Sequence, residues 1–390
     1  MPRLFRLRTA SYVTSHQPFA LRLITGFALA LTLGAPVATA QGRIDVLNNN
    51  GEITPLAGTT VIKETLDSVQ YTRAGSDRTE NRPADRVIFI EYGKGSEAFE
   101  SAQRALTLGD TQNAINLFST ATRDEKPGWV SAHALLSLAE AQAQEEKLDD
   151  ARASIKRFLV EHPDHRLLPR ALLLSARYAS AASDAGLAQS EVDRVKEMAA
   201  SGKITADWSV RAEVEHGQNL LDAGRFDEAR TAFATAETDA RNAEKLTTER
   251  PDLTAQISAL ALRARSGSGA ALLAAGDLAT ARSFFDTLER DGQNNPAIRA
   301  AALNGKAEAD FLESGRMREA QLGFARVAVI GTGVPDQHAK ALYYFGRCCE
   351  ALGEQGVEPN GRTRAYQYYK DVEQRYPSTR WARMARESLP

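Results

Sequence analysis

Apolar residues recur along most of the chain at the spacing of amphipathic helices. Residues 211–236 (RAEVEHGQNLLDAGRFDEARTAFATA) show this pattern most fully. Ala229, Phe233 and Ala236 follow one another at positions i, i+4 and i+7, which places them on one face of a helix. Gly224 separates this helix from the one before it, because a residue without a Cβ atom takes turn angles that other residues resist. The stretch therefore predicts two antiparallel helices packed through small and large side chains.

The same face and the same break return several times between residue 96 and the C-terminus. Breaks at Gly224, Gly276 and Gly315 lie 52 and 39 residues apart, and Gly186 precedes the first of them by 38 residues. A unit of roughly 34–40 residues is the size of one helix–turn–helix pair, so we expect about seven pairs and a final helix at 381–389. The residues that define the turns and the small–large–small faces are Gly109, Ala114, Phe118, Ala151, Gly217, Gly224, Ala229, Phe233, Gly269, Gly276, Ala281, Phe285, Gly315, Ala320, Phe324, Gly346, Ala365, Tyr369 and Pro377.

Residues 42–95 have a different pattern. β-Branched and aromatic residues alternate with polar ones at 61–66, 69–71 and 86–92, and Asn-Asn-Asn-Gly at 48–51 is a turn signal. We expect a small β-module of about four or five strands. Its sequence resembles small Sm-like or SH3-like barrels. The alternative is a β cap that closes the end of the helical part.

From about residue 96 onward, the chain resembles tetratricopeptide-repeat proteins, because it shares their glycine-marked break and their order of small and large residues. The aromatic residue common at the start of the first helix is mostly missing, the unit at 167–203 is degenerate, and the helix after Gly224 is lengthened. The resemblance implies an all-α repeat solenoid, a TPR-like right-handed superhelix, which spans 96–390 and follows the small N-terminal β-module.

The last unit resembles a more specific group of proteins. Residues 365–389 (AYQYYKDVEQRYPSTRWARMARESL) are similar to the C-terminal repeats of two exported bacterial families, the Tol–Pal envelope coordinator and the outer-membrane assembly lipoprotein. The shared features are A-x-x-x-Y, then Y-P-S/N-S/T, then an alanine-rich helix. The lipoprotein is anchored through a cysteine that this chain lacks after its N-terminal apolar run, so we expect no lipid anchor.

Residues 1–40 have the features of a secretory signal peptide. Four arginines precede the apolar run 23–33, and Ala38-Thr39-Ala40 is a small-x-small cleavage site. We expect cleavage after Ala40 and export to the periplasm or the extracellular space. An organelle transit peptide is the alternative, because no acidic residue precedes Asp45.

The expected mature chain is mildly acidic. Without the four arginines it has 44 basic and 50 acidic side chains, a net charge of −6. This charge gives no basic field for a nucleic-acid partner. No apolar run of the mature chain reaches the roughly 18–20 residues of a membrane span.

Stacked helix pairs offer a concave face lined by the first helix of each pair, which is a binding surface and seldom a catalytic pocket. The family spacing, counted from the small residue at the eighth position, projects a set of polar residues onto that face. We expect them to clamp backbone or carboxylate groups of partner proteins or peptide segments; alternatively, they pair with glutamates of adjacent helices. The candidates are Arg211, Gln218, Arg263, Lys340, Tyr343 and Arg347, with His133 as a further one.

Few residues suggest other chemistry. Cys348 and Cys349 are adjacent, and neighbours on a helix rarely bridge, so we expect two small buried side chains rather than a redox or metal site. His162 and His165 lie in His-Pro-Asp-His at a break between units, yet no third ligand is nearby in sequence. We therefore expect no metal, no cofactor and no enzymatic activity.

Together these observations predict a non-catalytic scaffold that holds partner proteins in the cell envelope. Two alternatives stay open. One is an accessory protein whose β-module binds the ligand, in which case deleting residues 42–95 should abolish that activity and leave the helices folded. The other is a metal- or redox-dependent protein.

Overall fold

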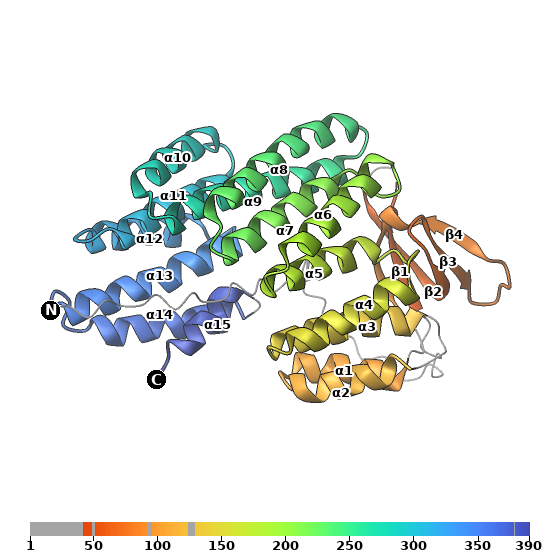
Figure 1. Cartoon of the computed structure of the whole chain (residues 1–390). Coiled ribbons are helices and arrows are strands. Elements are labelled where there is room, and N and C mark those ends of the chain that lie inside the picture. The colour runs from red at the N-terminus through yellow and green to blue at the C-terminus, as the bar shows by residue number, and fades with distance from the viewer. Residues whose placement is uncertain (1–41, 49–50, 93–95, 124–128, 378) are drawn as a thin grey trace, which may run out of the picture. The chain divides into compact units, whose positions relative to one another are not determined.

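The computed structural model describes residues 42–48, 51–92, 96–123, 129–377 and 379–390 (Figure 1). These residues form five strands followed by fifteen α-helices. The expected signal peptide at 1–40 lies outside the described residues. Within them, no helix is both long and apolar enough to cross a membrane.

The strands form one antiparallel sheet in the order β4-β3-β2-β1-β5. Strand β2 is the longest, and its pairing with β3 shifts between Val61 and Lys63, which is the mark of a β-bulge. A short 3₁₀ turn, Ala84–Arg86, leads into the last strand. The small β-module of four or five strands expected from the sequence is therefore confirmed. The strands are β1 Gly42–Leu47, β2 Ile53–Glu64, β3 Ser68–Arg73, β4 Glu80–Pro83 and β5 Val87–Glu91.

The helices follow as seven antiparallel pairs and one terminal helix, as Figure 1 shows. The expected repeat architecture of helix pairs is therefore confirmed. The terminal helix buries Trp381 and Ala385 against its neighbours, so it is amphipathic. The helices are α1 Glu97–Thr107, α2 Thr111–Ala121, α3 Trp129–Gln144, α4 Leu148–Glu161, α5 Leu168–Ala181, α6 Ala185–Ala200, α7 Asp207–Asp222, α8 Phe226–Leu246, α9 Pro251–Ala274, α10 Leu278–Asp291, α11 Pro296–Leu312, α12 Met317–Ile330, α13 Pro335–Glu354, α14 Gly361–Arg375 and α15 Arg380–Glu387.

Each described pair turns through one residue with a positive φ angle. Five of the seven are glycines, as in the left-handed turns that end many helices. The second and third pairs use Glu146 (φ 59) and Ser183 (φ 62) instead. Gly186 was wrongly assigned to the third break, because it lies inside α6. The seven turn residues are Gly109, Glu146, Ser183, Gly224, Gly276, Gly315 and Gly356.

The second helix of nearly every pair buries one aromatic ring. The ring packs where small residues let the helices approach, which gives each pair the same local core. The degenerate third pair has no such ring and fills the space with Val192, Val195 and Met198 of α6. The buried rings are Phe118, Phe158, Phe233, Phe285, Phe324 and Tyr369, and the alanines that precede them, Ala114, Ala151, Ala229, Ala281, Ala320 and Ala365, are buried as well.

The chain forms two compact units. One, here the β-containing unit, comprises residues 42–219 and Thr235–Ala261, and its helices α1 to α6 pack in chain order. The other, here the C-terminal unit, comprises Leu220–Ala234 and Leu262–Pro390, and its helices α10 to α15 pack in the same way.

Candidate functional site

A buried cluster of charged and polar side chains joins the β-module to the helices of the β-containing unit. Its centre is Glu64, the last residue of β2, whose carboxylate is fully buried. Tyr92 follows β5, His133 comes from α3, and His165 and Arg166 belong to the segment between α4 and α5. Three chain segments far apart in sequence therefore place their polar groups around one carboxylate.

The two carboxylate oxygens of Glu64 have different partners. Oε2 accepts a short hydrogen bond from Nε of Arg166. Oε1 accepts from the hydroxyl of Tyr92 at 2.5 Å and lies 3.2 Å from Nε2 of His133. Because the Tyr92 hydroxyl donates to Glu64, its contact of 2.8 Å with Nε2 of His133 requires that this nitrogen carries the ring proton. Glu64 is thus held by three donors.

His165 is held differently from the rest of the cluster. Its Nδ1 accepts the backbone N–H of Leu167 at 3.2 Å, so Nε2 carries the proton of the neutral ring. This Nε2 is buried, has no hydrogen-bond partner among the described residues, and lies 3.9 Å from Oε1 of Glu64. A buried donor without a partner is uncommon and asks for an explanation.

Aromatic rings surround the cluster and keep water out. Tyr92 stacks on Trp129 with 3.7 Å between ring centroids, and Phe158 meets the His165 ring edge to face at 6.0 Å. The side chains of His133 and Arg166 are 17% and 20% exposed, so these two residues retain limited contact with solvent. In such surroundings electrostatic interactions are stronger than at the surface.

The surroundings set the charge of each group. Burial by itself would raise the pKa of Glu64, but the electrostatic interaction and hydrogen bond with His133, together with the charge of Arg166, outweigh it and hold that pKa well below its usual range. Burial lowers the pKa of His165 to about 3. The negative charge of Glu64 acts in the other direction but only partly offsets the effect of burial. Burial also raises the pKa of Tyr92 well above its ordinary value. At neutral pH the cluster therefore contains a Glu64–Arg166 ion pair, a neutral His165 and a neutral Tyr92.

The cluster is part of a wider attachment of the β-module. The backbone N–H of Leu66 donates to the carbonyl of Asp164 at 2.8 Å, and the Leu66 side chain packs beside Leu168 and Leu172 of α5. Deleting residues 42–95 would expose this apolar surface and leave Arg166 without its carboxylate. We therefore no longer expect the helices to stay unaffected by that deletion.

The sequence pointed to only part of this cluster. His165 was considered as a metal ligand together with His162, but the ring nitrogen of His162 lies 3.2 Å from the Ser131 hydroxyl instead. The third group beside His165 is Glu64, which lies 69 residues before His133 and 102 residues before Arg166. No local spacing connects residues so far apart, and only the paired strands and helices bring them together.

The six residues expected to line a groove all lie on first helices. Arg211 and Gln218 belong to α7 in the β-containing unit, and the other four belong to α9 and α13 in the C-terminal unit. Arg263 and Arg347 are exposed. Arg211 lies over the Trp208 ring, 5.1 Å from its centroid.

Two of the six contribute to the core of the C-terminal unit. The Lys340 ammonium donates to Glu308 at 2.6 Å, and both side chains are mostly buried. Tyr343 is 3% exposed and packs with Tyr369 and Trp381, while its hydroxyl accepts from Arg347 at 3.2 Å. Lys340 thus has the intramolecular glutamate partner that the alternative interpretation expects.

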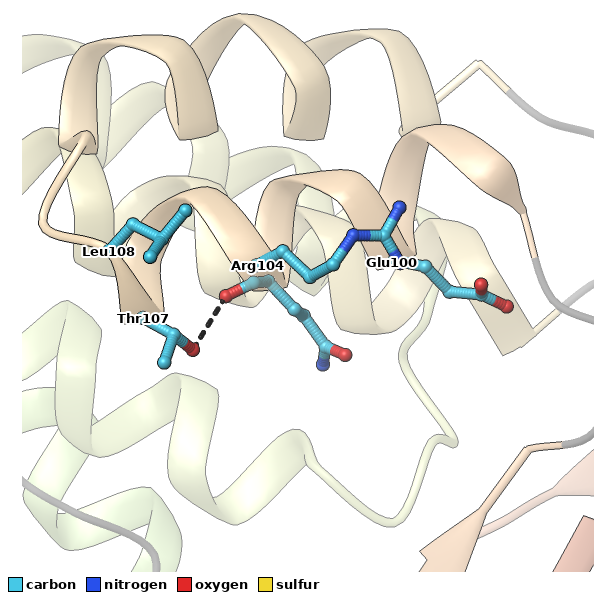
Figure 2. Close-up of a pocket in the computed structure, with 5 residues that line it drawn as sticks. Glu100, Arg104, Thr107 and Leu108 are labelled. Carbon is cyan, nitrogen blue, oxygen red and sulfur yellow. Dashed lines mark hydrogen bonds between the residues drawn. The ribbon is translucent and has the colours of Figure 1, made fainter.

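A hollow on the surface of α1 offers no comparable chemistry. Figure 2 shows that its lining side chains come from this one helix, and the Thr107 hydroxyl donates to the backbone carbonyl of Gln103 at 3.0 Å. Leu108 at its end is 84% exposed. A surface formed by one helix face does not enclose a ligand.

Comparison with known proteins identifies the repeats. Residues 99–166 and 214–296 match the family model described as tetratricopeptide repeat. These two stretches, which together make up less than half of the chain, have the sequence pattern of tetratricopeptide repeats. The matched ranges cover α1 to α4 and the region from α7 to α10, and they include His133 and His165 but not Glu64. No protein with a curated description is significantly similar in sequence.

Several solved structures resemble this chain at low sequence identity. A tetratricopeptide repeat protein from Parabacteroides merdae is 17% identical over 75% of this chain and 96% of its own, with a TM-score of 0.41. PilF of Pseudomonas aeruginosa is 18% identical over 66% of this chain and 96% of its own, with a TM-score of 0.33. The C-terminal part of a repeat protein from Cytophaga hutchinsonii is 13% identical over 75% and 99%, with a TM-score of 0.35.

Proposed function

We propose that this protein is an exported, non-catalytic scaffold that holds partner proteins of the cell envelope on the first helices of its repeats. The proposal is supported by the tetratricopeptide-repeat match together with the exposed first-helix residues Arg263 and Arg347. In stacked helix pairs of this kind the first helices line the concave face, which is the extended surface open to a partner.

Arg263 and Arg347 are the sharpest test of this surface, because both are exposed first-helix residues of the C-terminal unit. Arginine suits bidentate contact with a partner carboxylate. We expect Arg263→Glu and Arg347→Glu each to weaken crosslinking of a partner by at least about tenfold, which corresponds to loss of one charge-assisted contact.

Matched controls come from second helices of the same unit. Arg290 of α10 and Arg326 of α12 are also exposed, so Arg290→Glu and Arg326→Glu change the net charge equally. A photo-crosslinking residue placed beside each arginine, followed by mass spectrometry of envelope fractions, reads out the contact. Equal loss of crosslinks in first-helix and second-helix variants would show that only net charge matters and would refute the proposed surface.

Export is tested separately. We expect the protein isolated from the periplasmic fraction of a Gram-negative host to begin at Gln41, because cleavage follows Ala40. N-terminal sequencing measures this directly. A chain that keeps residues 1–40 and stays with the cytoplasmic fraction would exclude the envelope location.

The β-module is a second candidate for partner contact. It exposes four large apolar side chains, Ile53, Ile62, Ile88 and Phe89, which are 43–53% accessible. Surface apolar residues in such number often mark interaction sites. Phe89→Asp should reduce partner crosslinking if this module is the contact surface, and should leave it unchanged if the first helices act alone.

A further inference from the structure

The cluster around Glu64 brings together three side chains of the kinds that bind transition metals. One carboxylate oxygen of Glu64 and one ring nitrogen each of His133 and His165 all lie within 4.8 Å of one another. We propose that these three residues form a binding site for a divalent transition-metal ion, with zinc as the best fit. His133 is also the further candidate for the first-helix surface, but the metal site does not depend on the proposed scaffold function.

The distances are close to those of a bound ion. Zinc holds nitrogen and oxygen ligands at about 2.0–2.1 Å, so two ligand atoms of a tetrahedral site lie roughly 3.3 Å apart. Oε1 of Glu64 lies 3.2 Å from Nε2 of His133 and 3.9 Å from Nε2 of His165. All three ligand atoms lie within 4.8 Å of one another, so side-chain shifts of roughly 1 Å would bring them to the spacing of one ion. Two imidazoles and one carboxylate suit zinc better than calcium or magnesium, which prefer oxygen ligands alone.

The two oxygens of Glu64 are held by different groups, and the donors at Oε1 are Tyr92 and His133, whose contacts a metal ion would replace. Arg166 binds Oε2 and thereby turns Oε1 toward the two imidazoles, as outer partners of metal ligands commonly do. The Tyr92 hydroxyl lies 2.5 Å from Oε1 and 2.8 Å from Nε2 of His133. It is therefore in reach of the fourth ligand position, either directly or through a water molecule.

One ring nitrogen of His165 has no hydrogen-bond partner among the described residues. This observation favours a bound metal ion over a cluster held together by hydrogen bonds alone. Nε2 is buried, is directed to the centre of the cluster, and makes no hydrogen bond among the described residues. A metal ion bound there would satisfy this atom. Binding moves the ring proton from Nε2 to Nδ1 through solvent, and the Leu167 N–H at 3.2 Å then loses its acceptor.

A metal ion at this position would link the β-module to the helices. Its ligands come from the end of β2, from the N-terminal part of α3 and from the segment before α5. Each of these segments belongs to the β-containing unit. The ion would therefore act as a structural site that fixes the module on the second helix pair and on the segment that follows it.

The test uses the full chain produced without a polyhistidine tag and freed of metal by dialysis. Titration with zinc chloride in competition with a chromophoric chelator measures stoichiometry and affinity, and cobalt chloride reports coordination by its visible absorption. We expect one ion per chain, the absorption of a four-coordinate cobalt site, and a rise in Tm with zinc concentration. His165→Asn and Glu64→Gln should each weaken binding by at least about a hundredfold, because even outer-shell partners cost roughly 10–100-fold.

His162 supplies the matched control. It lies three residues before His165 and is itself partly buried, but its ring nitrogen faces Ser131 and not the cluster. His162→Asn should bind zinc like the unaltered protein. Absence of binding by the unaltered protein, or equal loss in His162→Asn and His165→Asn, would overturn the proposal. Should His165→Asn fail to fold, X-ray absorption of the zinc-loaded unaltered protein decides: two imidazoles with oxygen ligands support the site, and any other shell refutes it.

Discussion

The ring of Phe285 on α10 lies directly against Gly269 on α9. A Cβ atom at Gly269 would come within 2.3 Å of Cζ of this ring, and one at Gly305 on α11 would come within 2.2 Å from another helix. Phe285 is therefore enclosed by two glycines of successive first helices. The aromatic ring of one repeat packs against a glycine of its own first helix and a glycine of the next repeat. A single helix pair therefore cannot bury its own core.

We expect Gly269→Ala to destabilise the protein by about 1–3 kcal/mol. Overpacking a filled core costs this much, and it exceeds the roughly 0.5–1 kcal/mol that alanine gains over glycine within a helix. Urea unfolding followed by circular dichroism measures the change. Gly186→Ala in α6 is the control, because a Cβ atom there meets nothing within 4 Å; it should be neutral or stabilising. Equal behaviour of the two variants would contradict the packing argument.

The turns of the second and third pairs offer a stabilising substitution. Glu146 and Ser183 have φ angles of 59° and 62°, which side chains with a Cβ atom rarely adopt. Glu146→Gly and Ser183→Gly should each raise stability by about 0.5–1 kcal/mol, since glycine removes this strain at some cost in unfolded-state entropy.

The reverse substitution provides the comparison. Gly224 has a φ angle of 76° and open space around its Cβ position, so Gly224→Ala tests backbone strain without a steric clash. We expect a loss of about 1 kcal/mol in its unfolding free energy. Destabilisation by the glycine substitutions, or no effect of Gly224→Ala, would show that these turns carry no strain.

The buried pair Lys340–Glu308 predicts a large effect of removing one charge. Lys340→Met leaves the Glu308 carboxylate buried without its cation and should cost about 3–5 kcal/mol. Lys340→Met combined with Glu308→Gln should recover most of this loss, because glutamine keeps an acceptor for the Tyr344 hydroxyl at 3.0 Å. Lys306→Met is the control, since Lys306 pairs with more exposed carboxylates and should cost less than about 1 kcal/mol.

The same pair predicts a dependence on pH. Burial by itself would raise the pKa of Glu308, but the charge and hydrogen bond of Lys340 and the Tyr344 hydroxyl hold it below its ordinary value of 4.5. The pair therefore stabilises the fold fully above about pH 4.5, and this contribution is lost as the pH falls through the lowered folded pKa. In Lys340→Met, burial, the largest of the effects on Glu308, is opposed only by the Tyr344 hydroxyl and the charge of Arg380, so we expect its pKa to rise and its contribution to stability to fall as the pH rises above 4.5. Unfolding curves measured at several pH values distinguish the two signs.

The two cysteines should be inert in the folded protein. Cys348 packs against Phe324 and Ala300, and Cys349 packs against Tyr369 and Ala365. Burial raises the pKa of both thiols, which leaves little thiolate at pH 8. A chromogenic thiol reagent should modify neither residue before unfolding and both in denaturant. Rapid modification of the native protein would contradict the buried placement.

The sequence determined the repeat architecture because its signals are local. Each helix pair is encoded within roughly 40 residues by a turn residue and by apolar side chains at helical spacing, so seven pairs and a preceding β-module could be predicted. The exception at Gly186 has a physical reason as well. Glycine is the residue that most often adopts a positive φ angle at such a turn, but other residues can adopt it too. In the third pair Ser183 is the residue with the positive φ angle.

The tertiary structure alone decided which polar residues meet. Lys340 looks like other first-helix cations in sequence, yet it is paired with Glu308 on α11. Glu64 ends a strand of the β-module and has no sequence signal of its own, yet it meets His133 and Arg166, which follow it by 69 and 102 residues. Helical periodicity fixes which face of an element is apolar, but contacts between polar groups of distant elements depend on how those elements dock.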